Sequence, residues 1–502
     1  MPTKTNQRGV IPIDVPTSLR PAVYAASASI VAVGTAPVGS LPGFEWVQGG
    51  FASVVNRPIL TEMASDFTEQ LGESSNWKSY TLCEIYDAVY IEGNVSPYIP
   101  INVFDPWVHS TQVTNSTVTV DTAHLTVSIA AEVILPSLVV TGTGGVVYHD
   151  GVDFAFSYDD DTLQSATLNI YPTSPMAAET TVTLSYSVPD LSKITSADII
   201  GGVDTQGNYS GLEVLEKVYS VTGIVPATVL TPGWGDQDDV IAAGNSRVQS
   251  INNGRFRAIF LPDVDTTAVR KYEDLWTHKN ASNMVSAFET AGWPMLKLSN
   301  KLYHFSTILA YDMAWTDSNY GNIPYVSPSN KSVNIDGTVL ADGTVVDIDL
   351  AQADAIENWG LMTAVNDDGW KLLGDYTCAY PDDTDVHDFW INERRMFNWL
   401  GNSLGLTLKQ FIDLPGNVRT LASIGETIQQ FGNHLVAVGA SNTFRVRFLA
   451  SENLAEQVMA GIYTYHILWT PPTPIRTLDL LLEYSVDDLT AWIAQVTIPG
   501  TN

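Results

Sequence analysis

Basic residues are scarce in this chain of 502 amino acids. There are 24 Lys and Arg against 55 Asp and Glu, which gives a formal net charge of −31, yet only 16% of the residues are charged. Ordinary globular chains have about 25% charged residues, so the acidity comes from missing bases rather than from abundant acids. The phosphates of DNA and RNA would be repelled, and we expect no nucleic-acid partner. Because 45% of the residues are hydrophobic, the chain is not a disordered acidic tail.

Cysteines and long apolar runs are also few. Cys83 and Cys378 are the only cysteines, so a disulfide framework and a cysteine-based zinc site are excluded. No segment reaches the ~18 uninterrupted apolar residues of a membrane span, so we expect no direct membrane insertion. The weakly apolar stretch 22–36 starts late and follows three prolines, which is unlike a signal peptide. The sequence therefore predicts a soluble protein that is not exported.

One hydrolase-like motif is present. Residues 401–405 (GNSLG) match GxSxG, in which Ser403 would be the nucleophile. Asp413 and His434 follow downstream and would be its partners in a catalytic triad. A nucleophile elbow must lie between a strand and a helix, whereas residues 391–400 have helical periodicity. We interpret the motif as a helix that ends at glycine.

The acidic segment 382–388 (DDTDVHD) is the strongest candidate for a metal loop. Its ligand spacing matches no fixed motif, and capping of the following helix by Asp385 or Asp388 explains it better. No P-loop and no GxGxxG motif occurs. We therefore predict no catalytic, cofactor-binding or metal-binding residues, no cofactor, and a chain that is not an enzyme.

Hydrophobic periodicity predicts an α+β multidomain chain. Period-2 runs rich in Thr, Val and Ser, without any Lys or Arg, predict a β-sandwich inserted into an α/β core domain. Proline-spaced apolar residues predict an extended N-terminal arm. The expected parts are an arm at 1–24, the core domain at 25–104 plus 191–357, the sandwich at 105–190, a C-terminal α+β domain at 358–477 and a C-terminal arm at 478–502.

Individual elements follow from the same patterns. Residues 82–90, 211–221, 268–278, 391–400 and 418–431 have the periodicity of helices. Residues 29–33, 99–104, 227–230, 257–261, 458–469 and 478–484 are typical of strands.

Several short stretches, in order along the chain, resemble those of contractile-tail sheath proteins, the sheaths of myophages and of phage-derived particles such as R-type bacteriocins. They are IVAVGTAP at 30–37, NRPILT at 56–61, IIG at 199–201 with NYSGL at 208–212, SVTGIVP at 220–226 and SPSNK at 327–331. Residues 150–154 and 182–186 resemble the β-sandwich insertion of such sheaths. Where the family has WGNRT followed by an Arg-rich helix, this chain has GDYT at 374–377 and INERRM at 391–396.

The resemblance implies a structural subunit rather than an enzyme. Sheath subunits form hexameric rings that stack helically around an inner tube, and contraction drives the tube through a bacterial envelope. The implied partners are further copies of the chain, the inner tail tube protein, and baseplate and terminator proteins. The implied location is a virion tail or phage-like particle that is assembled in the cytoplasm of the bacterial host.

The resemblance also implies that both terminal arms add strands to sheets of neighbouring subunits, which suits their apolar side chains. The residues expected to link subunits are Gly9, Val10, Ile11, Ile13, Val15, Leu19, Leu478, Leu480, Leu482, Val496 and Ile498.

A local basic group stands out in this acidic chain. Arg394, Arg395, Lys409 and Arg419 lie close together in sequence, and we hypothesise that they contact an acidic tube surface through weak, salt-sensitive interactions. The alternative is ordinary surface charge.

A different class of protein also fits part of the composition. A secreted β-sandwich adhesin or glycan-binding protein would explain the 13 Trp, the 21 Tyr and the Thr-rich module. It predicts a cleaved N-terminus and a monomer, whereas a sheath protein predicts rings or striated tubes.

Overall fold

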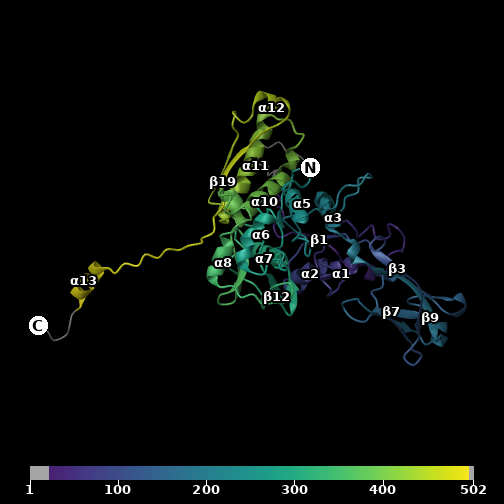
Figure 1. Ribbon diagram of the computed structural model, residues 1–502. Helices are drawn as coiled ribbons and strands as arrows, with labels where there is room; N and C mark the ends of the chain where they lie inside the picture. Colours follow the sequence, from purple (N-terminus) through teal and green to yellow (C-terminus); the bar gives the residue numbers. More distant parts are fainter. Residues whose placement is uncertain (1–21, 497–502) are drawn as a thin grey trace, which may run out of the picture. The chain divides into compact units, whose positions relative to one another are not determined.

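The computed structural model describes residues 22–496, which form two compact units (Figure 1). The first unit extends to Pro472 and the second begins at Thr473. The predicted N-terminal arm lies almost wholly outside the described residues, as do six of its proposed linking residues and Ile498. Those six are Gly9, Val10, Ile11, Ile13, Val15 and Leu19.

A parallel four-stranded sheet lies at the centre of the first unit. Its strands are β1 (Ile30–Gly34), β2 (Tyr98–Asn102), β10 (Thr228–Leu230) and β11 (Ile259–Leu261), in the order β11-β10-β1-β2. All their residues are buried, as expected for a parallel sheet that is covered on both faces. The predictions of strands at 29–33, 99–104, 227–230 and 257–261 are confirmed.

Helices cover this sheet. They include α2 (Leu82–Tyr86), which continues as a π-helix (Asp87–Glu92), α5 (Asp238–Gln249) and α7 (Phe305–Asn319). The helix predicted at 82–90 is therefore confirmed, and the one at 211–221 is present as a 3₁₀ turn (Gly211–Val214) followed by α4 (Leu215–Thr222). Shorter helices are α1 (Ala64–Leu71), α3 (Ser196–Ile200) and α8 (Leu350–Glu357).

The helix predicted at 268–278 begins later than expected. A 3₁₀ turn (Tyr272–Asp274) precedes α6 (Leu275–Ala281). The carboxylate of Asp265 accepts hydrogen bonds from the backbone N–H groups of Thr267 and Ala268. This side-chain bonding holds the chain in a turn there and competes with helix formation.

Two small antiparallel sheets complete this half of the unit. The first is β12 (Met295–Leu298), β13 (Lys301–Tyr303) and β15 (Gly337–Val339), and the second is β14 (Lys331–Ser332), β16 (Thr363–Asn366) and β17 (Trp370–Leu373).

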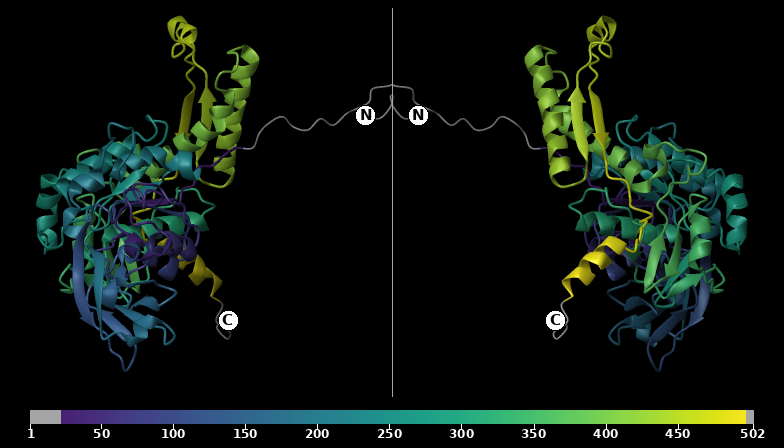
Figure 2. Two further views of the ribbon diagram at one scale, coloured as in Figure 1. Left: turned by 90° about the vertical axis from the view of Figure 1, so that its right-hand side faces the viewer. Right: turned by 90° about the vertical axis from the view of Figure 1, so that its left-hand side faces the viewer.

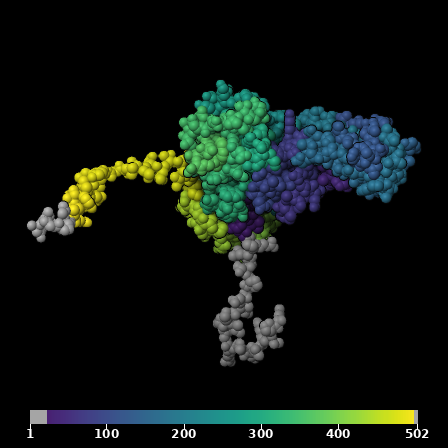
Figure 3. All heavy atoms as spheres, turned by 90° about the horizontal axis from the view of Figure 1, so that it is seen from below, coloured from purple at the N-terminus to yellow at the C-terminus, as the bar shows by residue number. Residues whose placement is uncertain are grey.

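Residues 110–189 form two further antiparallel sheets. One contains β3 (Ser110–Thr119), β9 (Thr181–Pro189), β5 (Val139–Thr141) and β6 (Val147–Tyr148), and the other β4 (Thr126–Ile129), β8 (Ala166–Ile170) and β7 (Phe154–Tyr158). Apolar side chains of both sheets, among them Val127, Leu168 and Leu184, form a buried cluster of their own. Figure 3 shows this blue part of the chain standing out from the green part of the first unit. The exact domain boundaries stay predictions.

The C-terminal part of the first unit contains four helices and a hairpin. The helices are α9 (Val386–Phe389), α10 (Ile391–Leu408), α11 (Val418–Ala437) and α12 (Ala455–Met459), and the hairpin strands are β18 (Thr443–Arg447) and β19 (His466–Thr470). In Figure 2 the long helix α11, in green, stands beside the two hairpin strands. The helices predicted at 391–400 and 418–431 are confirmed, and both continue further.

The single strand predicted at 458–469 is wrong. Helix α12 comes first, and pairing begins only at His466. The amide of Asn453 explains this, because it donates to the carbonyls of Leu449 and Thr464 and accepts from the N–H of Thr464. These three bonds close a loop that the β-type composition does not reveal.

The second unit contains one helix. Residues 473–484 have no regular structure, so the strand predicted at 478–484 is not formed within the described residues of one chain, and α13 (Val486–Gln495) follows. Ser485 caps α13 by accepting a hydrogen bond from the N–H of Asp488, and Asp487 and Asp488 place negative charge in its first turn. The expected extended arm therefore carries a helix.

Candidate functional site

Helix α10 is the element on which most predicted site residues lie. It follows the short helix α9, whose N-cap is Asp385, with a side chain that accepts from the N–H of His387. This confirms that the acidic segment 382–388 caps a helix. The remainder of the site depends on which way the side chains of α10 point.

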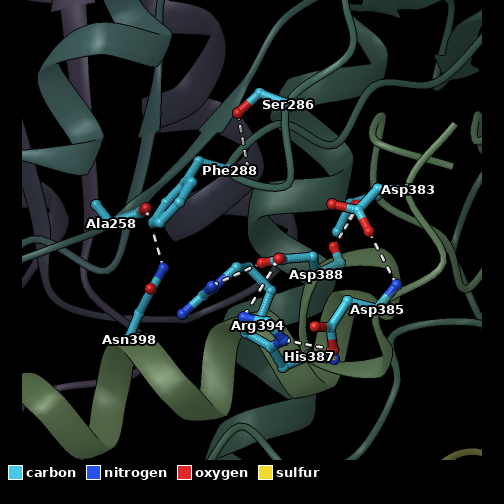
Figure 4. Close-up of polar contacts among 10 residues, drawn as sticks. Ala258, Ser286, Phe288, Asp383, Asp385, His387, Asp388, Arg394 and Asn398 are labelled. Atoms are coloured by element: carbon cyan, nitrogen blue, oxygen red, sulfur yellow. Dashed lines mark hydrogen bonds and ion pairs between the residues drawn. The ribbon is translucent and has the colours of Figure 1, made fainter.

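Arg394 is buried, with 5% of its surface exposed. Its Nη1 donates to Asp388 Oδ1 at 2.9 Å, and its guanidinium lies 4.7 Å from the ring centre of Phe288 and 5.6 Å from that of Phe397 (Figure 4). Burial lowers the pKa of Arg394, and the adjacent carboxylate of Asp388 opposes that shift. The residue is thus an internal cation held by one carboxylate and two aromatic faces.

Arg395 is buried to the same extent and forms a bidentate pair with Asp317 of α7. The Nη1–Oδ1 distance is 3.1 Å and the Nη2–Oδ2 distance is 2.6 Å. The premise that Arg394 and Arg395 form a basic surface is therefore wrong. Each meets a carboxylate supplied by another element, and such pairs can be buried where a lone guanidinium cannot.

Lys409 and Arg419 do lie on the surface. The ammonium of Lys409 is 5.9 Å from the ring centre of Tyr219, and neither residue forms a salt bridge within residues 22–496. Of the four basic residues predicted to contact a tube, only these two remain available.

The segment 382–388 gathers three potential metal ligands. Ligand atoms of Asp385, His387 and Asp388 lie within 4.8 Å of one another (Figure 4). The imidazole of His387 already contacts both carboxylates, at 2.7 Å from Asp385 and 3.2 Å from Asp388, and the guanidinium of Arg394 contacts Asp388. The protein's own side chains occupy this cluster, so we assign no metal to it.

Two buried carboxyl groups near these helices lack a complete set of partners. Burial raises the pKa of Glu393 to about 7, with a small opposing effect from His387, and Glu393 Oε1 has no hydrogen-bond partner. Burial likewise raises the pKa of Asp312 to about 7, against the effects of Lys331 and Arg395, and Asp312 Oδ2 has no partner. Both carboxyls are more readily protonated than exposed ones.

Ser403 is inside the protein rather than at an exposed elbow. It is fully buried, and its Oγ accepts a hydrogen bond from the N–H of Ala25 at 2.9 Å. Helix α10 runs through Gly401 and Gly405 to Leu408, so the expectation that the helix ends at this glycine motif is wrong. The strand-turn-helix context of a nucleophile is absent around Ser403.

The same face of α10 holds the first described residues of the chain. Thr407 Oγ1 accepts from the N–H of Val23 and donates to its carbonyl, and Trp399 Nε1 donates to the carbonyl of Ala25. The ring of Tyr24 packs 5.9 Å from that of Trp399. These anchors join residues that are more than 370 positions apart, so no local sequence signal could reveal them.

The β18-β19 hairpin has one open edge. Within the described residues each strand pairs only with the other, but Gln429 of α11 donates to the carbonyl of Phe444 and accepts from the N–H of Val446, which covers the outer edge of β18. The outer edge of β19 could accept a further strand. Beside the hairpin, α11 and Val446 of β18 border a groove of about 510 Å³, which is also lined by the flanking residues Phe448 and Tyr465.

The second unit exposes apolar residues. Leu478, Leu480 and Leu482 are 72%, 73% and 93% exposed, and Trp492 on α13 is 62% exposed. Across residues 22–496, no helix combines the length and the apolarity that a membrane crossing needs.

No protein-family model matches the chain. The chain is similar to the tail sheath protein of Burkholderia phage BcepMu, with 26% identity over 507 residues and 98% of each chain covered. Its fold is similar to the helical sheath of the anti-feeding prophage in the contracted state (TM-score 0.55, 12% identity, 96% of this chain and all of that one). A chain of the six-fold symmetrised baseplate of that prophage is also similar (TM-score 0.54, 11% identity, 96% of this chain and all of that one).

The fold is therefore that of a sheath subunit of a contractile system. Taken with the phage relative, which is matched along nearly its entire length at 26% identity, the fold supports a contractile tail sheath protein. The similarity is to sheath proteins of phage tails and phage-like particles, and the alternative of a secreted adhesin is not favoured. Its relatives are structural proteins rather than enzymes.

Proposed function

We propose that the chain polymerises with copies of itself into stacked hexameric rings around an inner tube, and that contraction of this sheath drives the tube through a bacterial envelope. The rings form on a baseplate, end at a terminator protein, and assemble in the cytoplasm of the bacterial host.

The observation that carries this proposal is the unsatisfied apolar surface of the second unit. Three leucines and Trp492 expose most of their side chains. Exposing this much contiguous apolar surface is unfavourable in water, because each buried large apolar side chain gains about 1.5–3 kcal/mol. A neighbouring subunit that covers these residues removes the cost and links the two subunits.

The open edge of β19 supplies a complementary surface. Strand addition gives affinity through backbone hydrogen bonds, whereas alternate side chains select the partner. We propose that an arm from a neighbouring subunit pairs at this edge, so that subunits stay connected when the rings change their spacing. Residues 478–484 can supply one such strand because they are not yet paired.

Assembly tests the proposal directly. Negative-stain microscopy and sedimentation of the purified full-length chain should reveal rings or striated tubes. We expect the Leu480→Ser/Leu482→Ser variant to stay as separate subunits. Val152→Ser is the matched control, since Val152 is 72% exposed in the turn between β6 and β7 of the first unit. Normal tubes from the double variant would contradict this use of the arm.

The tube-contact hypothesis is now limited to Lys409 and Arg419. The Lys409→Glu/Arg419→Glu variant should form sheath polymers without a tube but should not assemble on purified tubes. Lys271→Glu reverses another exposed charge and should behave as the wild type. Tube-loaded particles in normal yield from the double variant would refute the hypothesis.

A further inference from the structure

The topology of the central sheet creates a crevice at one end. β1 connects onward to its neighbour β2, whereas β10, which lies on the other side of β1, connects onward to β11. The loops that leave β1 and β10 therefore diverge to opposite sides. In open parallel sheets, ligands bind in the crevice at the carboxyl ends of the strands where this reversal occurs.

A cavity of about 670 Å³ occupies this position. It is lined by residues of the loops that follow the carboxyl ends of three strands: Thr35 after β1, Trp234 and Asp236 after β10, and Asp263 after β11. The volume lies within the range of about 300–1,000 Å³ that is typical of small-molecule sites.

Two carboxylates at the wall of the cavity are buried and held in place. Glu84 accepts from both the backbone N–H and Nδ1 of His304, each at 2.7 Å. Asp263 accepts from the N–H of Ser306 at 3.0 Å and from its Oγ at 2.7 Å. Burial alone would lower the pKa of His304, but Glu84, Asp263 and Asp236 raise it to about 10, so the imidazole is a cation here.

A third carboxylate in the lining belongs to Asp236. Among the described residues, no other residue donates a hydrogen bond to its side chain. Burial and the charges of Asp263 and Asp265 raise the pKa of Asp236 to about 6. Nearby, the buried hydroxyl of Thr231 has no partner. Thr231 Oγ1 and Asp263 Oδ2 both lie close to Gly235. A Cβ atom built on this glycine would be 3.2 Å from the hydroxyl oxygen and 3.3 Å from the carboxylate oxygen.

The charge of the cavity indicates a cationic ligand. Its lining contains five acidic residues, Glu84, Asp236, Asp263, Asp265 and Asp342, against Lys78 and His304. Arg270, outside the lining, pairs with Asp342 at 2.9 Å, so the net charge is 3 − 5 = −2 if all of these groups are ionised. Such a concentration of like charge is stable only when it is partly neutralised.

The geometry argues against a single metal ion. Three metal-ligating atoms lie within 4.8 Å of one another in the described part of the chain only at Asp385, His387 and Asp388, and not in this cavity. Its carboxylates are too widely spaced to share one small ion. Trp77, Trp234 and Phe305 also line the cavity, and aromatic side chains suit methylene groups and can face an ammonium through their rings.

We propose that this cavity binds an aliphatic polyamine, with one ammonium group at Asp236 and the methylene chain against the aromatic side chains. The ligand neutralises the carboxylates beyond the carboxyl ends of β10 and β11 and so links the loops that follow these two strands. The site is separate from the arms and hairpin that serve assembly.

Isothermal titration calorimetry of the full-length chain with spermidine, at fixed ionic strength, tests the proposal. We expect one site per subunit, and an affinity that falls about tenfold in Asp236→Asn and more in Asp236→Lys, because a charge-assisted contact is lost or replaced. No other residue donates a hydrogen bond to the Asp236 side chain, and its raised pKa means that the ionised carboxylate does not stabilise the fold, so Asp236→Asn should keep the wild-type circular dichroism and melt at no lower temperature.

Asp413→Asn is the matched control, because it removes one exposed carboxylate from another part of the chain at a backbone angle that asparagine tolerates (φ 65°). Three results would each overturn the proposal. The first is that spermidine binds Asp236→Asn and Asp413→Asn equally well, which indicates diffuse attraction to a chain of charge −31. The second is that Mg²⁺ binds the wild type as tightly as spermidine does. The third is that lysine methylamide binds as tightly as spermidine and also depends on Asp236, which indicates a site for a neighbour's basic side chain.

Discussion

The buried pair between Arg395 and Asp317 should make a large contribution that is revealed only when one partner is removed. In Arg395→Met, the two hydrogen bonds at 3.1 and 2.6 Å are lost and Asp317, whose side chain is fully buried, loses its cation. Breaking a buried pair in this way costs about 3–5 kcal/mol of the free energy of unfolding.

The cost should depend on pH. Burial already raises the pKa of Asp317, against the opposing effect of Arg395. Without the guanidinium that pKa rises further, so the folded variant binds a proton over a range in which the unfolded chain does not. The free energy of unfolding of Arg395→Met should therefore fall as the pH rises from about 4, the ordinary pKa of an aspartate, towards neutrality.

Urea denaturation, followed by tryptophan fluorescence at pH 5 and pH 8, measures both effects. The double variant Arg395→Met/Asp317→Leu removes both charges and should recover most of the loss. Arg419→Met, at an exposed arginine, should change the stability by no more than about 0.5 kcal/mol. If Arg395→Met costs no more than Arg419→Met, the reasoning from burial is wrong.

Three further predictions concern other sites. Asp312→Asn should raise the free energy of unfolding at pH 8 but not at pH 4. The pKa of Asp312 is about 7 in the folded state, above that of the unfolded chain, so the carboxylate destabilises the fold once it ionises. Paired urea titrations at the two pH values check this. Gly432→Ala places a Cβ inside the ring of Phe444 and should lower stability by about 1–3 kcal/mol in thermal unfolding, whereas an unchanged melting temperature would refute that packing. Ser403→Ala leaves the N–H of Ala25 without an acceptor, should cost about 1–3 kcal/mol, and should speed proteolysis near residue 25.

The sequence predicted the local elements of the core well. The strands β1, β2, β10 and β11 are short runs rich in β-branched residues, and their burial leaves little conformational choice. The antiparallel strands between residues 110 and 189 follow equally from alternation of polar and apolar residues. In both cases, the pattern that forms the element lies within the element itself.

The site was less predictable because its partners are distant in sequence. Arginine is usually found on protein surfaces, and Arg395 is buried here because it pairs with Asp317, which lies 78 positions away in the sequence. The polar anchors Ser403 and Thr407 similarly depend on Ala25 and Val23. The unpaired state of residues 478–484 has the same origin, since a strand needs a partner and this chain offers them none within the described residues.

The attachment of residues 22–25 to α10 has a mechanical consequence. Tension applied ahead of residue 22 is shared by the bonds at Thr407, Ser403 and Trp399 before it reaches β1, an inner strand of the parallel sheet. At the other end of the first unit, Asn392 of the same helix donates to the carbonyl of Pro472. A pull on either terminal region is therefore borne by the same helix, and α10 acts as the common load-bearing beam of the subunit.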